Sequence, residues 1–135
     1  MRKQQQIAHR QKYVTTLLGR KRRLPFINSS NYMESSYAER LSINSPTQGT
    51  AAEITISAQN RIAANKRLKE LDYQMLIQVH DEVVGECPEE NVEEACLILK
   101  DLMENPFEDI LEDFEFKHVP MVVDPSWGDN YREAK

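Results

Sequence analysis

The chain has 135 residues, of which 40% are hydrophobic and 29% charged, and its formal net charge is −5. This length suits one folded domain, and the composition excludes disordered and fibrous proteins. No apolar run reaches the ~18 to 20 residues that span a bilayer, and two cysteines are too few for a disulfide framework or a four-ligand zinc site.

The first forty residues carry most of the positive charge. Residues 1–40 hold nine Lys or Arg against two acids, a sum of +7, whereas residues 41–135 hold eight against twenty, a sum of −12. A basic segment favours an anionic partner such as nucleic acid, although a solvated charged face would give the same pattern.

The same segment predicts a helix end, a short strand and a loop. Residues 1–12 are polar and Gln-rich, as at the end of a helix. Residues 13–18, Tyr-Val-Thr-Thr-Leu-Leu, are β-branched and aromatic and stop at Gly19, which indicates a strand. The basic run at residues 20–23 and an Asn/Ser-rich stretch at residues 28–31 follow.

Two helix starts come next. Asn31 with Glu34 three residues later has the spacing of a capping box and predicts a helix over residues 33–43. The sequence Ser-Pro-Thr-Gln at residues 45–48 is a second start, with Ser at the cap and Pro at the first helical position. A helical apolar stripe continues from there to about Lys69.

The rest of the chain predicts a hairpin, a helix and a strand. Residues 73–79 and 83–87 are strand-like, and residues 75–79 are apolar enough to be buried. A periodic helix with an acidic outer face follows over residues 88–105. Residues 119–123 form the last strand, at a sheet edge because Pro120 cannot donate a ladder hydrogen bond. This order favours an α+β fold in which helices pack on an antiparallel sheet.

The tip of the hairpin, His80-Asp81-Glu82, is the segment with the most chemistry. Carboxylates at the end of a stiff strand are a suitable platform for Mg²⁺, which prefers oxygen ligands and usually takes one or two protein carboxylates. Asp is also an ordinary residue of tight turns that face water, so a purely structural role fits the spacing as well.

Four segments resemble the family A DNA polymerases, the DNA polymerase I-like group. The segment Gln-Val-His-Asp-Glu-Val at residues 78–83 resembles the third palm motif of that family. Residues 13–25 resemble the segment after the fingers, and residues 38–53 resemble the helix pair that tracks the primer–template. Residues 119–124 and 128–135 resemble the C-terminal strand and tail. The order of the segments is also that of the family.

The resemblance implies a fold and an activity. Residues 1–135 would be a single partial domain, the C-terminal part of an antiparallel palm-type sheet whose hairpin carries the acidic motif. The activity would be template-directed nucleotidyl transfer to a primer 3′-hydroxyl by a two-metal mechanism, in DNA replication or repair. The implied partners are primer–template DNA and deoxynucleoside triphosphates, and no membrane.

The resemblance also implies roles for single residues. Asp81 would hold Mg²⁺ and Glu82 would assist it, while Gln78 and His80 would lie near the primer terminus. A second set of residues would contact DNA. Three of them recur at four-residue spacing, so on a continuous helix they would share one face and reach minor-groove acceptors, and two others could grip phosphates. The members of this set are Arg40, Asn44, Gln48, Arg20 and Arg22.

Simpler roles remain open for these side chains. Gln48 could complete a capping box, Arg40 could form a surface salt bridge, and His80 could pack at a strand end. Arg20 and Arg22 could belong to a solvated basic loop. The sequence assigns His9 no partner and no role.

Several family features are missing from these residues. The first palm motif with the other metal-binding Asp and the fingers helix that binds the nucleotide are absent, so nucleotide-binding residues are unknown. Lys12 stands where the family usually has Gly, and the usual aromatic pair of the tail is here Asn130-Tyr131.

We therefore expect the chain alone to be inactive, as a gene fragment, a truncated product or one half of a split enzyme with a second chain. The alternative is a non-catalytic module that binds primer–template DNA or a partner polymerase chain. The compartment stays open, since bacterial, viral and organellar members share these segments.

Overall fold

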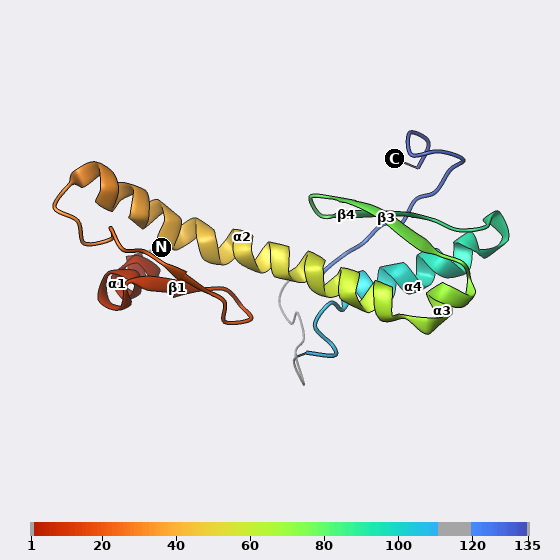
Figure 1. Ribbon diagram of the computed structural model, residues 1–135, viewed down its shortest axis with the longest axis horizontal. Helices are drawn as coiled ribbons and strands as arrows, with labels where there is room; N and C mark the ends of the chain where they lie inside the picture. The colour runs from red at the N-terminus through yellow and green to blue at the C-terminus, as the bar shows by residue number, and fades with distance from the viewer. Residues whose placement is uncertain (1, 111–119, 135) are drawn as a thin grey trace. The chain divides into compact units, whose positions relative to one another are not determined.

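The computed structural model describes residues 2–110 and 120–134. Its elements in chain order, drawn in Figure 1, are α1 Arg2–Gln11, β1 Tyr13–Thr15, β2 Lys21–Arg23, α2 Tyr32–Ala64, α3 Lys66–Glu70, β3 Gln74–Val79, β4 Glu82–Glu86, the 3₁₀ turn η1 Glu89–Asn91 and α4 Val92–Glu104. The described strands form two antiparallel pairs, β1–β2 and β3–β4. The predicted α+β class is confirmed.

The chain divides into two compact units, Met1–Glu53 and Ile54–Lys135. Helix α2 contributes residues to both units. None of the described helices is long and apolar enough to cross a membrane. The predicted strand at residues 119–123 is wrong for residues 120–123, which form no strand, and Val119 lies outside the described residues.

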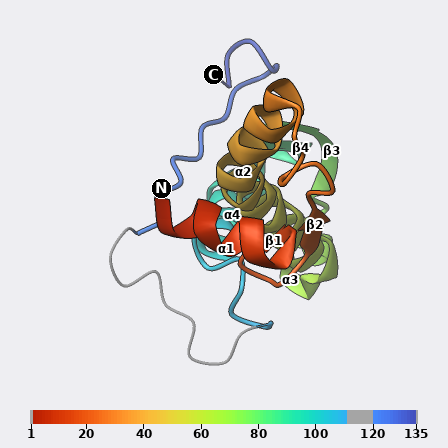
Figure 2. The same ribbon diagram turned by 90° about the vertical axis from the view of Figure 1, so that its left-hand side faces the viewer.

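The core of the first unit lies between α1, the β1–β2 hairpin and the start of α2. Figure 2 shows α1 beside β1. The side chains that are buried together are Ala8, Val14, Leu24, Ile27 and Ala38, with Leu41 packed against them. These residues come from a helix, a strand, a loop and a second helix, so their burial joins all four segments of the unit.

Lys12 ends α1 in the left-handed backbone region, with φ of 61°. Its N–H donates to the carbonyl of Ala8 at 2.8 Å, and its own carbonyl accepts from the N–H of Leu24 at 2.8 Å. The left-handed residue therefore turns the chain from the helix into the hairpin. A residue with a Cβ is strained there, since this region favours glycine.

The basic run is a strand and not a loop. β2 pairs with β1 so that Tyr13 faces Arg23 and Thr15 faces Lys21. The predicted first strand is shorter than expected because the chain turns after Thr15, where the N–H of Thr16 bonds to the carbonyl of Arg20 at 3.0 Å. The sequence predicted no partner strand for β1, because three consecutive basic residues are not typical of a strand.

Helix α2 is continuous through Pro46, so the predicted break at residue 45 is wrong. A proline inside a helix removes one backbone hydrogen bond and its ring crowds the carbonyl four residues earlier, so it usually kinks or ends the helix. Here the helix makes contacts on both sides of it. Before it, Ala38 is buried in the core; after it, Glu53 accepts hydrogen bonds from the Thr16 hydroxyl and the Leu18 N–H. The predicted cap at Asn31 is present, since its Oδ1 accepts from the N–H of Met33 at 3.0 Å.

The second unit contains a helix break, at Asn65, that the sequence did not predict. Helix α2 ends at Ala64, and Asn65 caps the short α3 by accepting a hydrogen bond from the Leu68 N–H at 3.0 Å. The C-terminal end of α3 is a Schellman motif: Asp72 has φ of 54°, and the N–H of Tyr73 reaches back to the carbonyl of Leu68 at 2.9 Å. This reversal directs the chain into β3.

The core of the second unit joins the end of α2, α3 and α4. The buried side chains are Ile62, Leu68, Leu71, Ala95 and Leu102. The helix predicted over residues 88–105 is present as η1 and α4, and Ala95 and Leu102 of α4 are two of these side chains.

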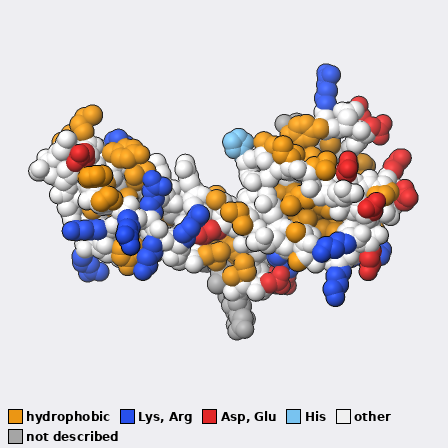
Figure 3. All heavy atoms as spheres, in the orientation of Figure 1, with side chains coloured by type: hydrophobic (Ala, Val, Ile, Leu, Met, Phe, Trp, Pro, Cys, Tyr) orange, Lys and Arg blue, Asp and Glu red, His pale blue; other side chains and the backbone are white. Residues whose placement is uncertain are grey.

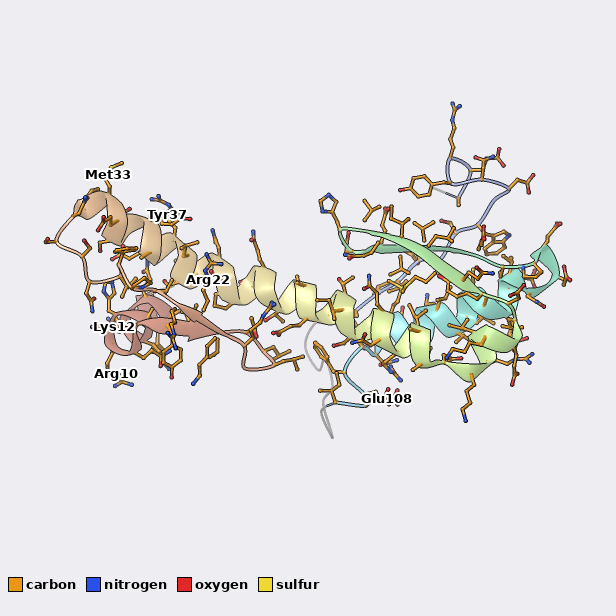
Figure 4. The ribbon with its side chains drawn as sticks, in the orientation of Figure 1. Arg10, Lys12, Arg22, Met33, Tyr37 and Glu108 are labelled. Carbon is orange, nitrogen blue, oxygen red and sulfur yellow. The ribbon has the colours of Figure 1, made fainter. Side chains whose placement is uncertain are left out.

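Arg61 fastens the loop that follows α4. Its side chain is only 12% exposed, with Nε 2.8 Å from the Asp109 carboxylate and Nη2 2.7 Å from that of Glu108, which Figure 4 labels. Its Nη1 also donates to the carbonyl of Asn105. One cation therefore satisfies three oxygens just past the helix end, where carbonyl groups lack helical partners.

The predicted hairpin is present as β3 and β4, but β3 is not buried. Met75, Leu76 and Ile77 are 40%, 58% and 54% exposed. Within the described residues β3 pairs only with β4. Figure 3 shows hydrophobic side chains gathered over this hairpin.

Candidate metal and nucleic-acid site

The tip of the β3–β4 hairpin is a two-residue turn, His80-Asp81, between the paired residues Val79 and Glu82. His80 adopts the left-handed conformation that such a turn needs, with φ of 55°. The Gln78 side-chain amide donates to the carbonyl of His80 and so braces the turn. Asp81 and Glu82 are exposed. The turn thus presents two adjacent carboxylates to solvent, with Gln78 and His80 beside them.

The other end of the hairpin is held by a close fit between Tyr73 and Gly85. A Cβ added to Gly85 would lie 2.3 Å from the Tyr73 hydroxyl oxygen and 2.6 Å from the carbonyl oxygen of Gln74. Only glycine fits there. Opposite Gly85, β3 has a register shift between Met75 and Ile77. Burial raises the pKa of Tyr73 to about 12.

As a metal site, the tip is incomplete on its own. Carboxylate oxygens are the ligands that Mg²⁺ prefers, and Asp81 and Glu82 fit that preference. Among the described residues, however, no group of three or more His, Cys, Asp or Glu side chains is placed to hold an ion. The pair therefore fits part of a metal site, and further ligands have to come from elsewhere.

The predicted helix face is present on α2. Arg40, Asn44 and Gln48 are all exposed and lie four residues apart on one continuous helix. The Arg40 guanidinium donates to the Ser36 hydroxyl at 3.1 Å and lies 5.9 Å from the centre of the Tyr37 ring. The capping role considered for Gln48 is wrong, because no helix begins at residue 45.

Arg20 and Arg22 differ in their surroundings. Arg20 fastens the hairpin to α2, with Nε 3.5 Å from the Glu53 carboxylate and Nη2 donating to the carbonyl of Gly49 at 3.3 Å. Arg22, labelled in Figure 4, is exposed on β2. Of the two, Arg22 is the freer to reach an anion.

His9 does have partners, contrary to the sequence-based expectation. Its Nδ1 lies 2.7 Å from the Asn28 side-chain oxygen, and its Nε2 lies 3.0 Å from the Glu39 carboxylate. The Asn28 amide nitrogen donates to the carbonyl of His9 at 2.9 Å, which leaves the Asn28 oxygen as an acceptor. The Asn28 hydrogen bond, followed by Glu39, raises the pKa of His9. Partners 19 and 30 residues away leave no local signal in the sequence.

Comparison with known proteins identifies the family. The model of the family DNA polymerase family A matches residues 1–133. DNA polymerase I of Bacillus caldotenax is 41% identical over 132 residues, which cover 96% of this chain and 14% of that protein. DNA polymerase I B, mitochondrial, of Oryza sativa subsp. japonica is 39% identical over 136 residues, covering 99% of this chain and 13% of that protein.

A solved structure agrees with these sequence matches. The POL domain of Pol1 from M. smegmatis, in complex with DNA primer-template and dNTP, superposes with a TM-score of 0.74 and 34% sequence identity. The match covers 78% of this chain and 18% of that one. This chain belongs to DNA polymerase family A, and the resemblance seen in the sequence is confirmed. It spans only 13% and 14% of the length of the two relatives above.

Proposed function

We propose that the chain is the C-terminal palm portion of a DNA-directed DNA polymerase that acts in DNA replication or repair. The observation that carries the proposal is the exposed Asp81-Glu82 pair at a braced hairpin tip, in a chain whose residues 1–133 match the family. The proposed substrates are primer–template DNA and deoxynucleoside triphosphates, the molecules in the M. smegmatis complex. Residues 1–135 would together form one partial domain of the complete enzyme.

In this proposal Asp81 is a ligand of divalent metal, with Mg²⁺ the natural choice for oxygen donors, and Glu82 assists it. A pair of bound ions supplies the activation of the primer 3′-hydroxyl and the neutralisation of the triphosphate charge. The chain's own contribution is to hold the two carboxylates at a fixed place, through the Gln78 brace and the short turn. The other carboxylates belong to palm residues outside these 135.

DNA contacts in the proposal come from two groups of side chains. His80 donates a hydrogen bond to the primer backbone near its terminus, next to Gln78. Arg40, Asn44 and Gln48 reach the minor groove, where both orientations of a correct base pair present acceptors in similar places. Such contacts check pairing without reading sequence. Arg22 neutralises a phosphate, while Arg20 holds the hairpin that carries it.

The first test is primer extension by the 135-residue chain alone, with Mg²⁺ and all four nucleotides. We expect no extension, because one acidic pair cannot hold two ions and no larger donor cluster exists among the described residues. Robust extension by the purified chain would contradict this part of the proposal.

The second test places the segment in a complete enzyme. Residues 1–133 replace the matching segment of the Bacillus caldotenax polymerase, and we expect extension to be retained. Asp81→Asn in that chimera should lower kcat by at least ~100-fold, about 3 kcal/mol of transition-state stabilisation. Glu93→Gln, at an exposed acid on α4, is the matched control. A chimera with Asp81→Asn that extends primers at the parent rate would refute the role of Asp81.

The exposed apolar side chains of β3 favour a second candidate, a non-catalytic module that binds primer–template DNA or a partner polymerase chain. Mixing the chain with a relative's polymerase that lacks the matching segment separates the two candidates. Restored extension indicates a split enzyme. Binding without extension indicates a module.

A further inference from the structure

The positive charge of the first unit is left largely uncompensated by its own acids. The unit has nine Lys or Arg and three acidic residues, and each acid is already bonded: Glu34 to Ser29, Glu39 to His9 and Glu53 to Arg20. Among the described residues, none of the ion pairs includes Lys21, Arg22 or Arg23. Figure 3 shows Lys and Arg side chains gathered over α1 and the β1–β2 hairpin.

The strand register places part of this charge on one face of the hairpin. Residues that lie opposite each other in an antiparallel pair share a face. Tyr13 faces Arg23 and Thr15 faces Lys21, so these four residues form what we call the outer face. Val14, paired with Arg22, is buried, so the core lies on the other side.

The outer face combines a ring with two cations. The Lys21 ammonium lies 5.0 Å from the centre of the Tyr13 ring, and both Lys21 and Arg23 are exposed. The two cations are two residues apart on a strand, a separation of about 6.8 Å along the backbone. Arg10 and Lys12, labelled in Figure 4, add two exposed cations at the point where α1 leads into β1.

We propose that the outer face, with Arg10 and Lys12, binds the phosphate backbone of single-stranded DNA. The successive phosphates of a DNA strand can form ion pairs with several exposed cations that no nearby carboxylate neutralises. An aromatic ring among such cations is typical of surfaces that bind single strands without reading sequence. The residues of this site are different from Arg40, Asn44 and Gln48 of the helix face. This inference rests on the proposed function at one point, the identification of the bound single strand as the template.

The test measures binding of a fluorescent 20-residue oligo(dT) to the full chain by anisotropy across a salt series. The double variant Lys21→Gln/Arg23→Gln should bind several-fold more weakly at low salt. Its slope of log affinity against log salt should be flatter by about 1.4, since each lost single-strand phosphate contact removes about 0.7. Charge reversal, Lys21→Glu/Arg23→Glu, should weaken binding further.

The matched control is Lys66→Gln/Lys69→Gln, which removes the same charge from two exposed residues of α3. It should leave the slope unchanged, and circular dichroism verifies that all variants are folded. Equal salt slopes for the control and the Lys21/Arg23 variant would overturn the proposal. It would also be overturned if the Lys21/Arg23 variant lost binding to polyglutamate as strongly as binding to oligo(dT), because that result would indicate an acidic protein as the partner. Neither result depends on primer extension by the chimera, so the proposed function can fail or hold independently.

Discussion

At the scale of single residues, the backbone conformation of a few positions decides how the elements connect. Lys12, Asp72 and His80 all have positive φ, and each stands where the chain reverses direction. Two of the three are residue types that tolerate this region, whereas Lys is not among them. Lys12 is also the position at which the sequence departs from the glycine usual in the family. The structure shows why glycine suits it.

Replacing Lys12 by glycine should therefore stabilise the chain. The left-handed conformation costs a residue with a Cβ roughly 1 to 2 kcal/mol, and part of that gain is offset by the greater freedom of glycine in the unfolded chain. We expect Lys12→Gly to raise the free energy of unfolding by about 0.5 to 1 kcal/mol in urea denaturation. Lys12→Ala removes the same charge but keeps the strain, so it should give no gain. Equal effects of both variants would contradict the backbone explanation.

His9 should make stability depend on pH. Both ring nitrogens face acceptor oxygens, which favours the protonated imidazolium and raises its folded-state pKa above 6.5. The contribution of the two His9 contacts to the free energy of unfolding is thus fully present below pH 6.5 and is lost as pH rises through the folded-state pKa. Denaturation of the wild type and of His9→Gln between pH 5.5 and about 8 measures the difference. The two stabilities should converge with rising pH; a constant difference would exclude the imidazolium.

At the scale of elements, the ends of helices depend on side chains far away in sequence. The loop after α4 is held by Arg61 of α2, 44 to 48 residues earlier. Similarly, the first turn after β1 is held by Glu53. By contrast, the cap signal at Asn31 is local and was reliable, whereas the one at residue 45 was misleading. At residue 45 the chain is already helical, and α2 runs on through Pro46.

Removing the Arg61 side chain should detach the loop after α4. Arg61→Ala leaves the Asn105 carbonyl and two carboxylates without their donor, and we expect a loss of about 1 to 3 kcal/mol in unfolding free energy. Arg67→Ala is the control, because it removes an exposed Arg with its own carboxylate partners. The control should lose clearly less. Thermal and urea denaturation compare the two, and equal losses would show that Arg61 acts only as a surface ion pair.

At the scale of the whole molecule, the surface of β3 is the feature that does not suit an isolated protein. Three consecutive apolar side chains, Met75, Leu76 and Ile77, are exposed on a strand whose described partner is β4 alone. Exposed apolar strands are sites where other chains pair. The surface agrees with a chain that spans 13% and 14% of the length of its relatives.

The isolated chain should therefore self-associate through β3. Light scattering coupled to gel filtration should show a mass that grows with concentration, and Leu76→Lys/Ile77→Lys should return it towards the monomer. Leu97→Lys, at a side chain of α4 that is 70% exposed, is the control and should change little. A monomeric wild type at every concentration would contradict this prediction.

Much of the fold and of the candidate site was predictable from the sequence. Local patterns were sufficient for α1, for the β3–β4 hairpin with Asp81 at its tip, and for α4 with its inner face. The family followed from four ordered segments and is confirmed. These features depend on residues close together in the chain, whose periodicity, turn chemistry and motif spacing can be read directly.

Other features were decided by tertiary structure alone. The strand character of the basic run needed β1 as a partner, and α2, which runs on through Pro46, contacts other segments before and after it through Ala38 and Glu53. The role of His9 needed Asn28 and Glu39, and the close fit of Gly85 needed Tyr73. The physical reason is common to all four: each depends on a contact between segments that only folding brings together, and no local pattern of residues encodes its free energy.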